Sequence, residues 1–149
     1  MATLQDQLKK SKNLTNNRLK SDLFQYVRSI EKDFLDKNKE QLKRDSQDIF
    51  GKPIGFYSKA TDILTNGKKA WGTPFTSFDT GDFFKGFVMQ EIDYNLSFRS
   101  TDPKTQLILK SKKWLSHELF GLTDKNLKAI ISKRLLPFYI KNIRNILEI

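Results

Sequence analysis

The side chains best suited to chemistry form one acidic cluster in the middle of the chain. Asp79 and Asp82 flank Gly81, and Glu91 and Asp93 follow shortly after. Paired carboxylates can perform general acid–base catalysis or hold a magnesium ion. Because no histidine or second acidic motif converges on this cluster, we expect Asp79 and Thr80 to form a turn or cap ahead of a strand instead.

Other catalytic and metal-binding side chains are scarce. His117 is the single histidine, and its neighbours Trp114 and Leu119 suggest a packing or surface residue. The chain has no cysteine, which excludes disulfides, thiolate zinc sites and cysteine nucleophiles. The glycines at 51–55, 67 and 72 fit no phosphate-binding loop pattern. We therefore predict a protein that is not an enzyme and that has no catalytic residues, no cofactor and no metal.

Length and composition indicate one globular domain spanning residues 1–149. The chain is 38% hydrophobic and 30% charged, as is usual for a folded protein. Its apolar runs are far too short to span a membrane, and its first residues lack the apolar core of a secretory signal. We therefore expect no membrane partner.

Helical periodicity marks both ends of the chain. Apolar residues between Leu19 and Phe34 recur at gaps of three and four, which predicts a long helix over about 16–48 with a break near 37–39. Residues 1–14 are polar and basic and are expected to form a flexible arm or a short helix. A final helix should begin after an N-cap at Thr123 and kink, or divide in two, at Pro137.

The middle of the chain is expected to be rich in loops and to contain a small sheet. Residues 51–82 predict a loop with one helical turn near 58–64, pinned to the protein by Trp71, Phe75 and Phe78. From Ile92 to Phe98 apolar and polar residues alternate, which predicts a half-buried strand with residues 84–89 as its partner or extension. Residues 105–110 fit a strand or a short helix. The predicted fold is α+β, with a long N-terminal helix, a loop-rich middle, a small antiparallel sheet and a kinked C-terminal helix.

Charge is the most unusual property of the chain. The 27 Lys and Arg exceed the 17 Asp and Glu and give a net charge of +10. Residues 101–149 contribute ten basic and four acidic side chains, and therefore +6 of that excess. Such a field favours a polyanionic neighbour, either nucleic acid or an acidic protein surface. The residues that we expect to face it are Lys110, Lys112, Lys113, Lys133 and Arg134.

Two interpretations of this basic set stay open. Lysines near phosphates give salt-dependent binding that does not depend on base sequence. Alternatively, the lysines form a solvated face that keeps the protein in solution. No helix-turn-helix, zinc-finger or ribonucleoprotein motif indicates a sequence-reading DNA binder.

Two stretches of the chain resemble a known family. The first runs from Phe50-Gly51-Lys52-Pro53-Ile54-Gly55 through Ser58 and Thr61 to Asp79-Thr80-Gly81-Asp82-Phe83. The second is Leu119-Phe120-Gly121-Leu122-Thr123-Asp124. Their order and spacing over about residues 16–147 are similar to those of the tail-completion and virion-morphogenesis proteins of tailed bacteriophages. The chain departs from many members in lacking a Tyr-Ala-x-x-His-Gln-x-Gly stretch within 101–113.

The resemblance implies a structural virion protein of the head–tail connector, neck or tail-completion region. Such a protein would form a ring of about 6–12 copies around the DNA channel. It would assemble in the host cytoplasm, contact neighbouring portal, adaptor or tail proteins, and touch packaged DNA transiently. In this interpretation Asp79, Thr80, Gly81, Phe120, Gly121 and Leu122 are family-like structural positions. The alternative function is a small basic nucleic-acid-binding accessory protein expressed by a phage.

Overall fold

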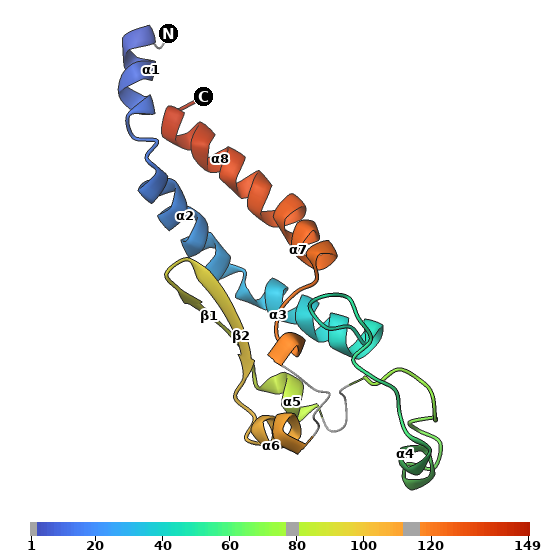
Figure 1. The fold of residues 1–149 in the computed structure, drawn as a ribbon. Coiled ribbons are helices and arrows are strands. Elements are labelled where there is room, and N and C mark those ends of the chain that lie inside the picture. Colours follow the sequence, from blue (N-terminus) through green and yellow to red (C-terminus); the bar gives the residue numbers. More distant parts are fainter. Residues whose placement is uncertain (1–2, 77–80, 112–116) are drawn as a thin grey trace. The chain divides into compact units, whose positions relative to one another are not determined.

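The fold is described from a computed structural model of the chain, for residues 3–76, 81–111 and 117–149 (Figure 1). It combines helices with one antiparallel hairpin, in agreement with the predicted α+β class. The chain divides into two compact units. Unit 1 comprises Met1–Glu31 and Leu127–Ile149, and unit 2 comprises Lys32–Asn126. The single-domain organisation expected from the length of the chain stays a prediction.

Unit 1 is helical and joins the two ends of the chain. Helices α1 (Leu4–Ser11) and α2 (Asn16–Ser29) begin at Thr3 and Thr15, whose hydroxyls accept backbone N–H bonds as N-caps. Both pack against α8 (Leu136–Leu147). Residues 1–14 were expected to form a flexible arm or a short helix, and the structure has a capped helix there, α1.

Specific side-chain contacts hold α2 to α8. The rings of Tyr26 and Phe138 stack with centroids 4.1 Å apart and planes inclined by 3°. Asn142 Nδ2 donates to Asp22 Oδ2 at 3.0 Å and forms a second link between the same two helices. These contacts fix the register of the two helices, although they are 120 residues apart in the sequence.

The C-terminal helix is interrupted as the proline predicts. Helix α7 (Asp124–Ile130) leads into a π-helical turn, η3 (Ile131–Leu135), and then into α8. The N–H of Leu136 donates to Ile131 O, five residues back, and Pro137 lies in the first turn of α8, where a missing N–H is tolerated. The Thr123 hydroxyl accepts from Asn126 N at 3.3 Å, so the predicted N-cap is confirmed.

The long N-terminal helix breaks at a different place from the one expected. It divides at Ile30, whose φ of −110° and ψ of 22° leave the helical region, and not at 37–39. Helix α3 (Glu31–Glu40) and the π-helical turn η1 (Gln41–Asp45) then continue without a gap. The helix ends at Ser46, which has a φ of 52°, close to the predicted end at about residue 48.

The core of unit 2 combines aliphatic and aromatic residues. Leu42, Ile54, Phe84, Phe87 and Leu119 are buried together. Phe83 and Phe120 pack on them, and the ring centroids of Phe83, Phe87 and Phe120 lie 5.0–6.0 Å from one another. These residues come from four separate stretches of the sequence, so the core closes only when all four meet.

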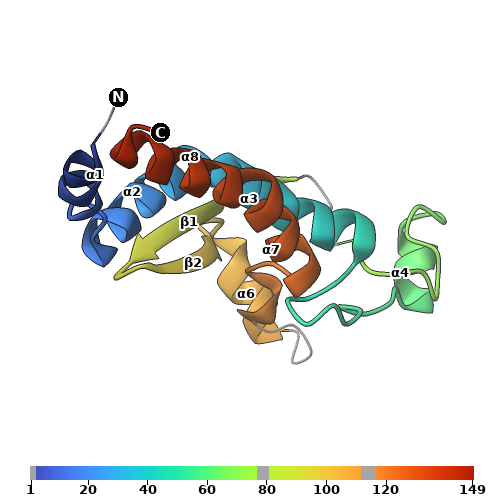
Figure 2. The same ribbon diagram turned by 90° about the horizontal axis from the view of Figure 1, so that it is seen from above.

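The sheet formed by the described residues is a two-stranded hairpin, and both views show its strands side by side (Figures 1 and 2). Strand β1 (Phe87–Ile92) pairs with β2 (Asn95–Ser100), and Met89 lies opposite Phe98. The turn residues Asp93 and Tyr94 both have positive φ, at 50° and 62°. The predicted strand over 92–98 is therefore wrong in its first half. The alternation continues across the turn, where Ile92 and Tyr94 are exposed.

Short helices flank the hairpin. Helix α5 (Asp82–Lys85) precedes β1, so residues 84–85 are helical and only 87–89 belong to the expected partner strand. Helix α6 (Lys104–Ser111) settles the ambiguity over 105–110 in favour of a helix, and the 3₁₀ turn η2 (His117–Leu119) follows. None of the described helices combines the length and apolar character that a membrane span requires.

Residues 46–76 form a long connection that leaves the core of unit 2 and returns to it. Two isolated β-bridges, Gln47 with Pro53 and Phe56 with Pro74, join its two sides. Beyond them lies α4 (Lys59–Leu64), whose N-cap Ser58 confirms the predicted helical turn. We call residues 58–72 the projecting segment, because both views place α4 away from the hairpin and α3 of the same unit (Figures 1 and 2).

Candidate functional site

Two carboxylates of the acidic cluster, those of Asp82 and Glu91, have local structural roles. Asp82 Oδ1 accepts from Lys85 Nζ at 2.9 Å within α5. Glu91 Oε1 accepts from Tyr94 N at 2.9 Å and braces the hairpin turn, of which Asp93 is part. Asp79 and Thr80 lie outside the described residues. Gly81 has a φ of +87° at the N-terminus of α5, a conformation that favours glycine.

Metal chemistry finds no support in the described part of the chain. Within it, no three His, Asp or Glu side chains are grouped closely enough to hold an ion. His117 is the first residue of the turn η2.

The loop at 119–124 is held by two buried amides on the helix formed by α3 and η1. Asn38 and Gln41 are both fully buried, and they lie three residues apart on one side of that helix. Asn38 Nδ2 donates to the carbonyls of Leu119 and Gly121 at 3.0 and 2.6 Å, while its Oδ1 accepts from Gly121 N at 3.3 Å. One side chain thus satisfies three backbone groups of the loop.

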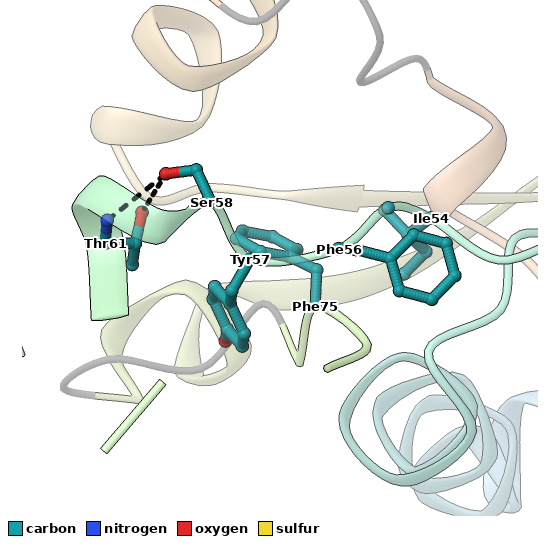
Figure 3. Close-up of a pocket in the computed structure, with 7 residues that line it drawn as sticks. Ile54, Phe56, Tyr57, Ser58, Thr61 and Phe75 are labelled. Carbon is teal, nitrogen blue, oxygen red and sulfur yellow. Dashed lines mark hydrogen bonds between the residues drawn. The ribbon is translucent and has the colours of Figure 1, made fainter. Parts of the chain in front are cut away.

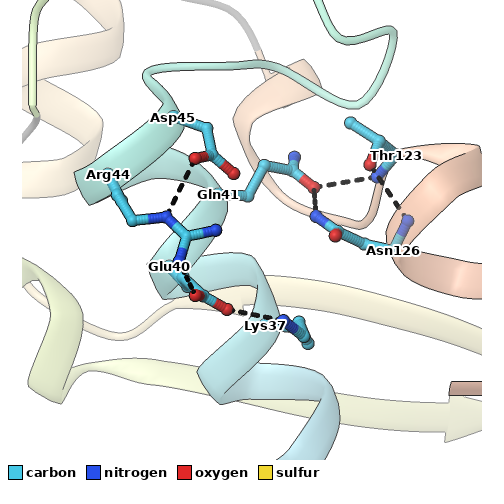
Figure 4. A network of polar contacts seen from close by, with 7 residues as sticks. All are labelled: Lys37, Glu40, Gln41, Arg44, Asp45, Thr123 and Asn126. Atoms are coloured by element: carbon cyan, nitrogen blue, oxygen red, sulfur yellow. Dashed lines mark hydrogen bonds and ion pairs between the residues drawn. The ribbon is translucent and has the colours of Figure 1, made fainter. Parts of the chain in front are cut away.

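Gln41 is the second amide that binds this loop, and we call Asn38 and Gln41 together the clamp. Its Oε1 accepts from Thr123 N and Asn126 Nδ2, both at 2.9 Å (Figure 4). Its Nε2 donates to the carbonyls of Gln47 and Asp48 at 3.3 and 3.1 Å. A buried amide that spans two segments in this way fixes both, because each unpaired group would cost about 1–3 kcal/mol.

Gly121 is the loop residue whose backbone the clamp binds. It is buried, and its φ of +142° lies in the region that favours glycine. A Cβ built there would lie 3.0 Å from Ile49 Cγ2. Phe120 packs into the aromatic core on one side, and Leu122 is half-buried on the other. Phe120, Gly121 and Leu122 therefore anchor the start of α7.

A partly exposed ionic cluster lies on the same helix, beside the amides (Figure 4). Lys37 Nζ is 2.6 Å from Glu40 Oε2, and the Arg44 guanidinium contacts both Glu40 and Asp45. The hydrogen bond from Lys37 holds the pKa of the Glu40 carboxyl below its ordinary value, and the charge of Arg44 adds to this effect. The pKa of Arg44 is raised, chiefly by its hydrogen bond to Asp45.

The positive charge is concentrated in unit 1. Its 54 residues contain 11 basic and four acidic side chains, a net charge of +7 out of the total of +10. Lys133 and Arg134 lie in η3 and are exposed. Lys110 is exposed on α6 of unit 2, whereas Lys112 and Lys113 lie outside the described residues. The structure thus gathers basic residues of the first 31 positions with those of the last 23.

Several acidic side chains of unit 1 are already engaged within it. Asp6 accepts from the backbone and hydroxyl of Thr3 in the capping box of α1, and these bonds lower its pKa. Asp22 bonds to Asn142, and Glu148 Oε2 lies 2.7 Å from Lys10 Nζ. The remaining field of this unit is strongly positive.

The projecting segment exposes large apolar side chains. Ile63, Leu64 and Trp71 are 68%, 83% and 66% exposed. The expectation that Trp71 pins the loop is therefore wrong, because its backbone N–H is bonded to Asp62 Oδ2 while its ring faces solvent. Phe75 does pack against the core, as predicted, and Phe78 lies outside the described residues.

Hydrogen bonds close the base of the projecting segment. Tyr57 N donates to Thr73 O at 3.0 Å and Phe75 N to Gly55 O at 2.8 Å. The Ser46 hydroxyl donates to Phe75 O and ties the segment to the end of η1. A hollow of about 370 Å³ opens here between Ile54, Phe56, Tyr57, Ser58, Thr61 and Phe75 (Figure 3). This framework holds the apolar tip away from the core.

Sequence reasoning missed Asn38, Gln41 and the exposed apolar tip. A signal for the two amides was present, because they occupy positions on the same helical face as Phe34 and Leu42, where an apolar residue is usual. No local pattern distinguishes an exposed Trp71 from a buried one. Comparisons with family models, with curated proteins and with solved structures found no match to this chain.

Proposed function

We propose that the chain is a structural subunit of a tailed-phage virion, a ring-forming component of the head–tail connector, neck or tail-completion region. The observation that carries this proposal is the projecting segment, with its exposed tip of Ile63, Leu64 and Trp71. Three large apolar side chains exposed on one short segment are typical of a surface that a subunit of an assembly buries against a neighbour.

The construction of the segment supports the same proposal. Backbone bonds and the Ser46 hydroxyl close the base of the segment, so the tip that this base carries loses less conformational freedom when it binds, and binding costs less. A patch on one side of a subunit that fits a different surface of the next gives a head-to-tail contact, which closes into a ring when the rotation allows.

Charge supports transient contact with DNA. The exposed Lys133 and Arg134 belong to a unit of net charge +7, which attracts phosphates without reading bases. Weak contact of this kind suits a channel that DNA must leave. Lys110 is the exposed member of the predicted set in unit 2.

Two measurements test the proposal. The first is quantitative mass spectrometry of nuclease-treated, density-purified virions, in which we expect a low fixed ratio to the portal protein, corresponding to about 6–12 copies. Absence from virions with abundance in infected cells would contradict a structural role.

The second measurement concerns the tip. The mass of the purified protein is measured by light scattering, alone and with its neighbouring virion proteins, for the wild type and for Leu64→Glu/Trp71→Ser. We expect the double variant to keep its circular dichroism spectrum and to lose the assembly. Lys52→Glu/Lys104→Glu, which changes exposed residues outside the segment, serves as a control and should assemble. Assembly of the tip variant would remove the main support for the proposal.

The alternative, a nucleic-acid-binding accessory protein, rests on the same charge. Titration with duplex DNA at about 150 mM salt separates the two functions, because non-specific affinity is then about 10⁻⁴–10⁻⁶ M. A dissociation constant well below this range would favour the accessory protein.

A further inference from the structure

The projecting segment carries positive charge as well as apolar side chains. Residues 58–72 contain three lysines and one aspartate, which gives a net charge of +2. Lys59 and Lys68 are exposed, and the aspartate, Asp62, accepts from Trp71 N at 3.0 Å through its Oδ2 atom. A surface that buries the tip of this segment should therefore be both apolar and negatively charged.

The turn of the hairpin has this complementary character, and we call its residues 91–95 the acidic turn. Ile92 and Tyr94 are 53% and 47% exposed there. The same five residues contain two carboxylates, Glu91 and Asp93, and no basic side chain, which gives a net charge of −2. Asp93 is exposed. The acidic turn thus combines exposed apolar side chains with a charge opposite to that of the projecting segment.

Both surfaces belong to unit 2, and they lie in separate regions of it. Both views show α4 of the projecting segment away from the hairpin (Figures 1 and 2). Complementary surfaces at separate places on one subunit meet only between copies. Such a contact is head-to-tail, the type that closes into a ring when the rotation between subunits allows.

We propose that the tip of one copy packs against the acidic turn of the next copy. The apolar side chains of the tip would cover Ile92 and Tyr94 and form the centre of the contact. The exposed Lys59 and Lys68 would lie near Asp93, so that charge favours this pairing of surfaces. This inference rests on the proposed function and deepens it, because it names the surface of the neighbour that receives the tip.

Other surfaces of a second copy fit the tip less well. Unit 1 has a net charge of +7 and would repel the lysines of the projecting segment. A symmetric contact between two tips would also bring lysines together, and it would end in a dimer instead of a ring. Charge therefore selects the acidic turn.

The first test is disulfide cross-linking, which suits this chain because it has no cysteine of its own. In Leu64→Cys/Ile92→Cys each copy carries one thiol on the tip and one on the acidic turn. These sites lie in separate regions of unit 2, so a disulfide joins them only between copies. After mild oxidation we expect a ladder of covalent oligomers on a non-reducing gel. The control Leu64→Cys/Gln106→Cys moves the second thiol to an exposed site on α6 and should yield at least about tenfold fewer oligomers.

A mixing experiment tests the direction of the contact without cross-linking. Leu64→Glu/Trp71→Ser removes the tip, and Ile92→Lys/Asp93→Asn removes the acidic turn while keeping a residue type that tolerates positive φ. Light scattering should find each variant monomeric by itself. The mixture should form dimers of one copy of each and grow no further, because only one intact contact remains.

The matched control for the turn variant is Asp36→Asn/Gln106→Lys. It makes the same change in net charge at two exposed sites of unit 2 and should assemble as the wild type does. Circular dichroism checks that each variant is folded.

Three outcomes would overturn the inference. Equal oligomer yields from the cysteine variant and its control would show that the two surfaces do not meet. Assembly of the turn variant by itself would place the tip on another surface of the next copy. Assembly only with other virion proteins, equal for the turn variant and the wild type, would assign the tip to an acidic surface of one of those proteins. The proposed function survives all three, whereas normal assembly of the tip variant would contradict the proposed function itself.

Discussion

At the scale of single residues, the buried amide of Asn38 is important for the stability of unit 2. It is fully buried and pairs with one N–H and two carbonyls of residues 119–121. We expect Asn38→Leu to lower the free energy of unfolding by about 2–4 kcal/mol, because buried backbone groups lose their partners. Urea denaturation followed by fluorescence measures the change. Asn17→Leu, an exposed site on α2, is the control and should change stability by less than about 0.5 kcal/mol. Equal effects of the two variants would contradict the role of the clamp.

A second prediction at this scale concerns the pH dependence of stability. The pKa of Glu40 is lowered in the folded chain, chiefly by its hydrogen bond from Lys37. A lowered pKa contributes stability that is complete above the unfolded value, about 4.3, and that disappears as the pH falls through the folded value. The pair is partly exposed, so we expect Glu40→Gln to cost less than about 1 kcal/mol at pH 7 and nothing at low pH. Denaturation at several pH values measures this difference. If the effect of Glu40→Gln is undiminished in a Lys37→Gln background, Lys37 is not the chief cause.

At the scale of elements, the hairpin depends on a turn with two left-handed residues. Asp93 and Tyr94 have φ values of 50° and 62°, as in a type I′ turn, which suits the twist of the paired strands. We expect Asp93→Val to lower the free energy of unfolding by about 1–2 kcal/mol, because a β-branched residue is strained at positive φ. Asp93→Gly should leave stability nearly unchanged.

The matched control for the turn lies on β2. Ser97→Val places the same side chain on the exposed face of an extended strand, where it should be neutral or slightly stabilising. Thermal unfolding of the three variants provides the comparison. If Val were tolerated equally at 93 and at 97, the left-handed turn would not be required.

At the scale of the whole molecule, the distribution of charge predicts where polyanions bind. Unit 1 carries +7 in 54 residues, so Lys133→Glu/Arg134→Glu should weaken binding to duplex DNA more than Lys52→Glu/Lys104→Glu, although both remove four charge units. Titrations at several salt concentrations should show a smaller salt dependence for the unit 1 variant. Equal losses would mean that only net charge attracts DNA.

The sequence by itself determined the elements whose causes are local. The caps at Ser58 and Thr123, the interruption around Pro137, the helical ends and the α+β class follow from backbone sterics and periodicity, which act over a few residues. The net charge of +10 is also a property of the sequence, since charge belongs to each side chain, whereas the basic surface itself stays a prediction.

The tertiary structure alone decided which distant segments meet. The break at Ile30, the turn at Asp93 and Tyr94, the clamp of Asn38 and Gln41 on the loop at Gly121, and the exposure of Trp71 are outcomes of packing. The same alternation from Ile92 to Phe98 suits one continuous strand or a strand and a turn, and burial selects between them. An amide on a helix does not reveal which backbone it will satisfy until the core closes around it, because that backbone lies about 80 residues away.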